Sequence, residues 1–149
     1  DDQGLKMGDV IEHGRWGRIL GEIGERHEQF DRERIVEQVR ASEFPHKPSR
    51  LTGSFAFARF EHADNFHEWR WNHGSKQHLY EVVPVDPNAL YHLGFMLCLP
   101  PFMGLEPLAV CRAYWNSDRH VFGIDLVQES YQEIVYDCPL EIIRVCHEQ

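Results

Sequence analysis

The chain has 149 residues and a formal net charge of −9. Hydrophobic residues make up 42% and aromatic residues 12%, which is typical of a folded globular protein and excludes a disordered chain. The acidic balance argues against a broad nucleic-acid surface, because such surfaces carry basic patches, but it allows one polyphosphate ligand held by one or two arginines. No apolar run approaches the roughly 20 residues that span a bilayer.

The first part of the chain predicts one irregular segment and one helix. The glycine-punctuated stretch LKMGDVIEHGRWGRIL predicts a strand and an irregular loop. FDRERIVEQVRASEFP predicts a helix in which Asp31 is the N-cap, Val36 and Val39 lie on the buried face, and Pro45 ends the helix. Acidic residues within helices, such as those in RERIVE, are expected on solvated faces.

The next stretch, FPHKPSRLTGSFAFARF, brings a basic residue to the start of a strand. Prolines set the direction of the chain, and a strand beginning at Ser54 is expected to bury Phe55 and Phe57. Arg50 enters this strand from the loop. It either points into a cleft or pairs locally, for example with Glu43.

The remaining elements mix short helices with strands. They are predicted as a helix over 63–71 ending at Gly74, a strand over 78–85, a helix over 86–97 with Asp86 as its cap, a helix over 108–115, and strands over 120–127 and 140–145. Long helices do not alternate regularly with the strands, so the pattern favours an α+β fold over a doubly wound parallel sheet. Two familiar glycine motifs bind phosphate groups, GxGxxG and GxxxxGK followed by serine or threonine. Neither of them follows a predicted strand.

The cysteines and histidines do not have the spacing of metal ligands. Cys98, Cys111, Cys138 and Cys146 lie among apolar neighbours without a CxxC pair, which indicates buried free thiols in a reducing compartment. The 10 histidines include no HExxH motif, so surface or locally hydrogen-bonded roles are expected. A metal-dependent hydrolase is the weakest of the functional hypotheses.

Two acidic residues near the end of the chain are candidates for chemistry. Glu129 and Glu133 bracket SYQ just before the predicted last strand. Carboxylates at a loop-to-strand boundary often face a cleft, although exposed acids at strand edges are also common.

Six short motifs resemble, in their order along the chain, a family of small bacterial domains with an ADP-ribosyltransferase-like fold. They are LKMGDVI, PSRL, SFAFA, LYEV, AYWNS and QEIVYDCPLEIIRV. The resemblance implies one domain over residues 1–149, with two small mixed sheets around a cleft and flanking helices. Many members of that family are uncharacterised.

The resemblance also implies NAD as the substrate, bound in the cleft between the sheets. Arg50, Ser54 and Tyr80 would bind NAD, and Tyr114 and Glu133 would be the catalytic residues. Tyr80 or Tyr114 would supply the aromatic face of the nicotinamide pocket, and Glu133 would stabilise the oxocarbenium-like state formed when the nicotinamide–ribose bond breaks. ADP-ribose would pass to an unknown acceptor, a protein rather than nucleic acid, or to water. Such a toxin or effector would act in the cytoplasm of its own or a target cell, without a metal or a membrane.

The chain departs from the family at two positions. The family's first-strand basic residue has no counterpart before Leu5. It is either missing or was removed with the N-terminus, and His13, Arg15 or Arg18 would have to replace it. Tyr131 stands where arginine-modifying members have a second glutamate, so arginine is not the expected acceptor. The alternative is a non-catalytic protein-interaction module on the same fold, with Trp69 and Trp71 as anchors.

Overall fold

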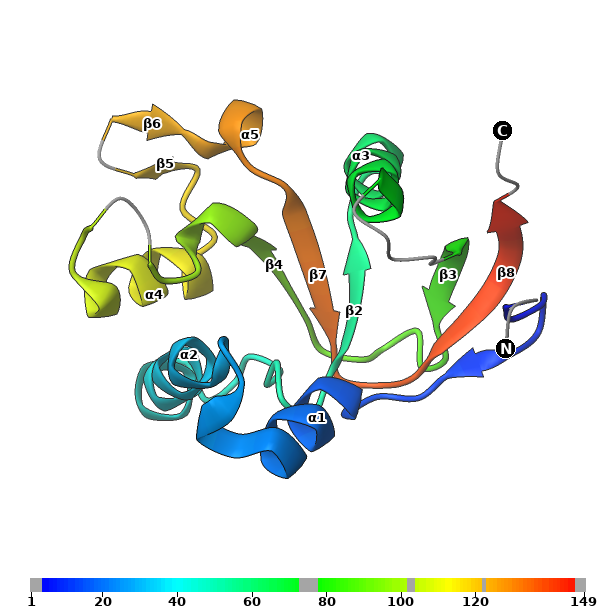
Figure 1. Cartoon of the computed structure of the whole chain (residues 1–149), viewed down its shortest axis with the longest axis horizontal. Helices are drawn as coiled ribbons and strands as arrows, with labels where there is room; N and C mark the ends of the chain where they lie inside the picture. Colours follow the sequence, from blue (N-terminus) through cyan, green and yellow to red (C-terminus); the bar gives the residue numbers. More distant parts are fainter. Residues whose placement is uncertain (1–3, 73–77, 102–103, 122, 147–149) are drawn as a thin grey trace.

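The computed structural model of the protein describes residues 4–72, 78–101, 104–121 and 123–146 (Figure 1). Its elements are β1 (Val10–Ile11), α1 (Arg15–Ile23), η1 (Gly24–Arg26), α2 (Phe30–Glu43), β2 (Ser54–Phe57), α3 (Phe60–Asn72), β3 (Leu79–Pro84), β4 (Tyr91–Phe95), η2 (Met96–Cys98), α4 (Pro107–Trp115), β5 (His120–Val121), β6 (Ile124–Asp125), α5 (Leu126–Glu129), β7 (Gln132–Tyr136) and β8 (Leu140–Cys146). Within these ranges no helix is both long and apolar enough to cross a bilayer.

The strands form two three-stranded sheets and one two-stranded sheet. Their orders are β1-β8-β3, β2-β7-β4 and β5-β6, and every pairing is antiparallel. The α+β prediction is therefore confirmed, whereas the sheets are antiparallel rather than mixed and a third small sheet is present. The central strands β7 and β8 follow one another in the chain, so a short connection joins the centres of the two larger sheets.

Helices cover the β2-β7-β4 sheet and the space beside it. Figure 1 shows α2 and α4 together, away from the β1-β8-β3 sheet, and α3 between β2 and β3. The main core lies where α2 and α4 meet, because Val36, Val110 and Trp115 are fully buried there. The indole of Trp115 donates a hydrogen bond to the Val36 carbonyl at 3.0 Å, so no polar atom of this side chain is stranded in the core.

Five predicted elements are confirmed with small shifts at their ends. They are the helix now bounded as α2, the strand beginning at Ser54, the strand β3, the helix α4 and the strand β8. Gln29, not Asp31, is the N-cap of α2, and Asp31 lies in its first turn. The helix α3 begins at Phe60, three residues earlier than predicted, and its predicted end at Gly74 lies outside the described residues.

The strand predicted within residues 5–20 is present as β1, but residues 15–20 belong to the helix α1, so the prediction of an irregular loop there was wrong. Trp16, Ile19 and Leu20 have helical spacing, but the interspersed glycines obscure it. A Cβ atom on Gly17 would lie 2.1 Å from the Leu51 carbonyl oxygen, so glycine lets α1 approach the loop before β2. The glycine at this position serves close packing rather than a turn.

The helix predicted over 86–97 is also wrong, since β4 and η2 occupy most of that range. Leucines at 90, 93 and 97 imitate helical spacing, but β4 is held by its pairing with β7. Gly94 packs against the ring of Tyr114, where a Cβ atom would lie 2.3 Å from the ring. The strand β7 itself was not predicted, and it places Glu133 inside a central strand rather than at a loop boundary.

Three of the four cysteines have the buried environment that their neighbours predict. Cys98, Cys111 and Cys138 are buried, Cys146 is half-buried, and all are free thiols. Burial raises the pKa of Cys98 to about 11 and that of Cys111 to about 12, with nearby acidic side chains adding to the effect. These two thiols therefore stay protonated at neutral pH and act as small apolar side chains.

Candidate functional site

Arg50 lies in the loop between α2 and β2, at the centre of a buried network. Its guanidinium donates hydrogen bonds to both carboxylate oxygens of Glu33 of α2, the shorter ones from Nε at 3.0 Å and from Nη2 at 2.9 Å. Nη1 donates to the Tyr114 hydroxyl of α4 at 2.9 Å and to Oε1 of Glu133 on β7. The Tyr114 hydroxyl donates to the same Glu133 oxygen at 2.6 Å. We call Glu33, Arg50, Tyr114 and Glu133 the Arg50 cluster.

The two carboxylates of the Arg50 cluster are compensated by Arg50 and by the neighbouring Arg32 in a buried site. Burial by itself would raise the pKa of Glu33, but the charges and hydrogen bonds of Arg50 and Arg32 outweigh it and hold that pKa below its usual value. Burial likewise opposes the charge on Arg50, yet its partners raise its pKa. Burial raises the pKa of Tyr114 to about 12, so its hydroxyl stays protonated. The cluster is a satisfied ion network.

The structure brings Arg50, Tyr114 and Glu133 of the predicted site together. They are only 5%, 0% and 6% exposed, so their polar atoms are committed to one another. Arg50 does not pair with Glu43, which binds Arg112 instead. The guanidinium carbon of Arg50 lies 4.9 Å from the centre of the Phe55 ring, which adds a cation–π contact to the network.

The other two predicted site residues lie elsewhere. Ser54 is buried, and its hydroxyl donates a hydrogen bond to the Cys138 carbonyl at 2.6 Å. Tyr80 is on β3 in the other sheet, where its hydroxyl accepts a hydrogen bond from the Leu5 backbone at 2.7 Å. The five predicted residues therefore do not form one site.

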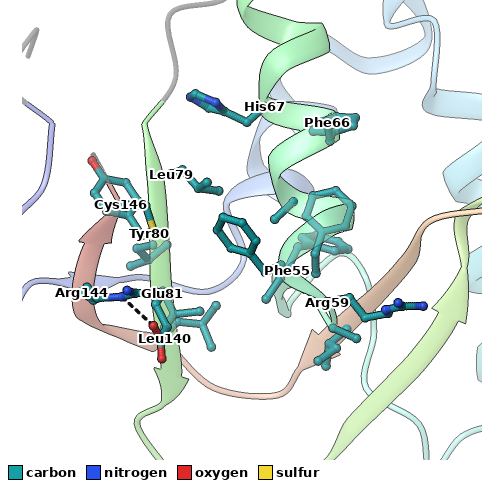
Figure 2. A pocket seen from close by; sticks show the side chains of 18 of the residues that line it. Phe55, Arg59, Phe66, His67, Leu79, Tyr80, Glu81, Leu140, Arg144 and Cys146 are labelled. Atoms are coloured by element: carbon teal, nitrogen blue, oxygen red, sulfur yellow. Dashed lines mark hydrogen bonds and ion pairs between the residues drawn. The ribbon is translucent and has the colours of Figure 1, made fainter. Parts of the chain in front are cut away.

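A cavity of about 680 Å³ lies between the two larger sheets and below α3 (Figure 2). Its body is apolar and partly aromatic, formed by Phe55, Phe57, Phe66, Leu79, Val82, Ile134 and Leu140. Ile134 and Tyr136 of β7 face this cavity, and strand alternation directs the side chain of Glu133 to the opposite face, toward α4. The cavity and the Arg50 cluster thus lie on opposite faces of β7, and Phe55 of β2 borders both.

Polar side chains lie along the cavity on the β3–β8 side. Tyr80 and Glu81 of β3 line it together with Arg144 of β8, and Arg144 Nε donates to Glu81 at 2.9 Å. Arg59 lines the opposite wall, and Figure 2 shows its guanidinium directed away from the Glu81–Arg144 pair. A flat apolar group with an anionic or hydroxyl-bearing end would match this combination of walls.

Three residues of the Arg50 cluster and the cavity wall were not predicted as site residues from the sequence. Glu33 was assigned to a solvated helix face, yet it is 1% exposed. It precedes the buried Val36 by three residues, and this spacing could have placed it on the inner face of the helix. Glu81 and Arg144 lie in strands that were predicted, but only the pairing of those strands shows that they are neighbours.

The histidines form no metal centre in the parts of the chain that the structure describes. In those ranges, no three histidine, cysteine or acidic side chains gather as potential ligands. His92 is the buried histidine, and its Nε2 donates to the Tyr114 carbonyl at 2.9 Å, which is the locally hydrogen-bonded role expected from the sequence.

Comparison with known proteins shows which sequence family the chain belongs to. No curated protein matches it. The family described as "Protein of unknown function (DUF2441)" matches residues 10–145, which extend from β1 into β8 and include both larger sheets, the Arg50 cluster and nearly all of the cavity wall. Because the match covers most of its length, the chain belongs to the DUF2441 family.

Proposed function

We propose that this protein binds NAD in the cavity between its two larger sheets and transfers ADP-ribose from the bound NAD to an acceptor or to water. The observation that carries the proposal is the cavity itself, about 680 Å³ in volume. This volume is within the range of small-molecule and cofactor sites, roughly 300–1,000 Å³. The location between two small sheets is also what the resemblance to ADP-ribosyltransferase-like domains implies.

The walls of the cavity support a nucleotide as the ligand. Phe55, Phe57 and Phe66 offer aromatic surface to the adenine or nicotinamide ring. Arg144 offers a guanidinium, the group that best matches a phosphate through paired hydrogen bonds. An apolar pocket with a few polar groups at one side is the usual composition of such sites.

Cleavage of NAD needs a carboxylate close to the nicotinamide ribose, because the transition state carries positive charge there. Glu133 was predicted for this role from the resemblance, and the role stays a prediction. In the present structure its carboxylate is held by Tyr114 and Arg50 on the face of β7 away from the cavity. This observation favours a second candidate, a domain that binds NAD without cleaving it.

The binding half of the proposal is tested by filling the cavity. Ala63 of α3 lines it, so Ala63→Phe should place a ring in the volume that NAD needs. Ala41→Phe, at an exposed position of α2, is the matched control. We expect NAD to raise the melting temperature of the wild type and of Ala41→Phe, but not that of Ala63→Phe. No NAD-induced shift in the wild type would contradict the proposal.

The catalytic half is tested by measuring nicotinamide release from NAD by the same three proteins. Release by the wild type and by Ala41→Phe, with loss in Ala63→Phe, would support ADP-ribosyl chemistry in the cavity. Binding without release would instead support the non-catalytic candidate. Glu133→Gln, assayed at a temperature where it is folded, should lose release if Glu133 acts in the reaction. An unchanged rate would remove Glu133 from the mechanism.

The other alternative from the sequence, a protein-interaction module, depended on Trp69 and Trp71. Both residues belong to α3, but their side chains lie outside the described part of the structure. That hypothesis therefore stays a prediction.

A further inference from the structure

We propose that Glu81 and Arg144 form a ribose-phosphate subsite in the cavity, where Arg144 binds a phosphate and Glu81 accepts hydrogen bonds from the neighbouring ribose hydroxyls. This inference rests on the proposed nucleotide binding and specifies which groups of the nucleotide are recognised. It concerns β3 and β8, and none of the residues predicted from the sequence to contact NAD takes part in it.

The two side chains are accessible to a ligand in a way that the Arg50 cluster is not. Glu81 and Arg144 are register partners across β3 and β8, and both line the cavity. The side chains are 49% and 65% exposed, compared with 8% and 6% for Glu133 and Arg50. A ligand can therefore reach this ion pair without opening the core.

The strand pairing changes register at this pair. Glu81 is opposite Arg144, whereas Val82 is opposite Ile142, so Ile143 is the extra residue of a bulge in β8. Bulges change the direction of side chains and are frequent beside functional sites. Figure 2 shows the resulting pair beside β3 and β8, with Tyr80 adjacent and the apolar walls of β2 and α3 across the cavity.

The pair can exchange its internal contact for contacts with a ligand at low cost. A half-exposed ion pair contributes little to stability, typically about 0–1 kcal/mol, because water already screens both charges. The separated guanidinium can bind a phosphate with two parallel hydrogen bonds. The released carboxylate is an acceptor for vicinal hydroxyl groups, as acidic residues are in other nucleotide sites.

The arrangement of charges explains why a nucleotide fits better than a simple anion. A simple anion would gain Arg144 but would also meet the repulsion of Glu81. In a nucleotide, the negative phosphate is attached to a ribose whose hydroxyls are hydrogen-bond donors. An adjacent cation and carboxylate match this order of groups, while the aromatic wall accommodates the base.

The experiment compares three probes by titration calorimetry: AMP, adenosine, which lacks the phosphate, and 2′,3′-dideoxy-AMP, which lacks the two hydroxyls. The proteins are the wild type, Arg144→Gln and Glu81→Gln. The matched controls are Arg112→Gln and Glu43→Gln, from an ion pair between α4 and α2 with the same 2.9 Å contact and 48% and 39% side-chain exposure, and neither of them lines the cavity.

We expect the wild type to bind AMP at least tenfold more tightly than either analogue. Arg144→Gln should abolish the preference for AMP over adenosine, and Glu81→Gln should abolish the preference for AMP over the dideoxy analogue. Each variant should keep the preference that the other loses. The control variants should keep both preferences.

Unchanged preferences in Arg144→Gln and Glu81→Gln would overturn the subsite. If Ala63→Phe still blocked NAD binding in that case, the proposed function would stand and the ribose and phosphate would be bound elsewhere in the cavity. If the wild type bound neither AMP nor NAD, both proposals would be overturned. Equal losses in the cavity variants and in the control pair would also overturn the subsite, because they would indicate a general electrostatic effect.

Discussion

At the scale of single residues, the dominant feature is a charged group buried among aromatic rings. Arg50 has Glu33 on one side and Glu133 with Tyr114 on the other, and it lies over the Phe55 ring. Burying a charge is expensive unless its hydrogen bonds are made, and in this cluster several partners from three elements make them. Arg50 thereby links the loop before β2 to α2, α4 and β7.

Removal of the guanidinium should therefore be costly. Arg50→Met leaves the buried Glu133 without its cation and leaves Glu33 with Arg32 as its remaining cationic partner, and we expect the free energy of unfolding to fall by about 3–5 kcal/mol. Urea denaturation followed by circular dichroism measures this change. Arg112→Met removes one partner of an exposed ion pair and should cost at most about 1 kcal/mol. Similar losses in the two variants would contradict the structural role assigned to the Arg50 cluster.

At the scale of elements, close contacts between backbones decide how the helices lie. The helix α1 approaches the loop before β2 so closely that Gly17 has no room for a side chain against Leu51. Gly21, one turn later in the same helix, has no neighbouring atom within 4 Å of the position a Cβ would take. One glycine is required by packing, and the other only weakens the helix.

The two glycines predict opposite effects for the same substitution. Gly17→Ala should destabilise the protein by roughly 1–3 kcal/mol, because the Leu51 backbone must move to accept the methyl group. Gly21→Ala should stabilise it by about 0.5–1 kcal/mol, because alanine loses less conformational entropy in a helix. Thermal unfolding of both variants beside the wild type checks this. Stabilisation by Gly17→Ala would show that α1 does not pack against the loop as described.

At the scale of the whole molecule, β7 lies between the packed interior and the cavity. One face of this strand contributes Glu133 and Val135 to the packed interior, and the other contributes Ile134 and Tyr136 to the cavity. A single central strand thus has one face in the packed interior, which stabilises the fold, and the other face on the proposed ligand site. Substitutions on its two faces should affect different measurements, stability for one and NAD binding for the other.

The stability of the whole molecule should decrease in acid because of His92. This side chain is 1% exposed, and burial, followed by the positive charge of Lys47, lowers its pKa to about 4. Above pH 6.5 the imidazole is neutral in both states. Below that, the unfolded chain takes up the proton first, so the free energy of unfolding should fall by about 3 kcal/mol between pH 6.5 and pH 4.

Urea denaturation at pH values from 4 to 8 measures this dependence. His92→Gln keeps a donor for the Tyr114 carbonyl but cannot take up a proton, so its stability should vary less with pH over this window. The exposed His46, replaced in the same way, serves as the control and should leave the slope as in the wild type. Parallel pH profiles for the wild type and His92→Gln would contradict the assignment.

Local pattern in the sequence was sufficient for several elements and for some of the candidate residues. The helix α2, the strand from Ser54, β3 and α4 follow from spacing, capping and proline positions, all of which are properties of neighbouring residues. Arg50, Tyr114 and Glu133 were selected together by a family resemblance, and they do lie together. Tyr80, also selected, lines the cavity.

The remaining features depend on pairings between distant parts of the chain. Glu33 can be buried because Arg50, 17 residues later in the chain, pairs with it. The segment β4 is a strand because it pairs with β7, although its leucines have helix-like spacing. The Glu81–Arg144 pair exists only because β3 and β8 align in one register. The sequence by itself thus determined local conformation and the α+β class. Tertiary structure alone decided which charges neutralise each other and which face of β7 borders the cavity, because those outcomes depend on contacts between segments far apart in the chain.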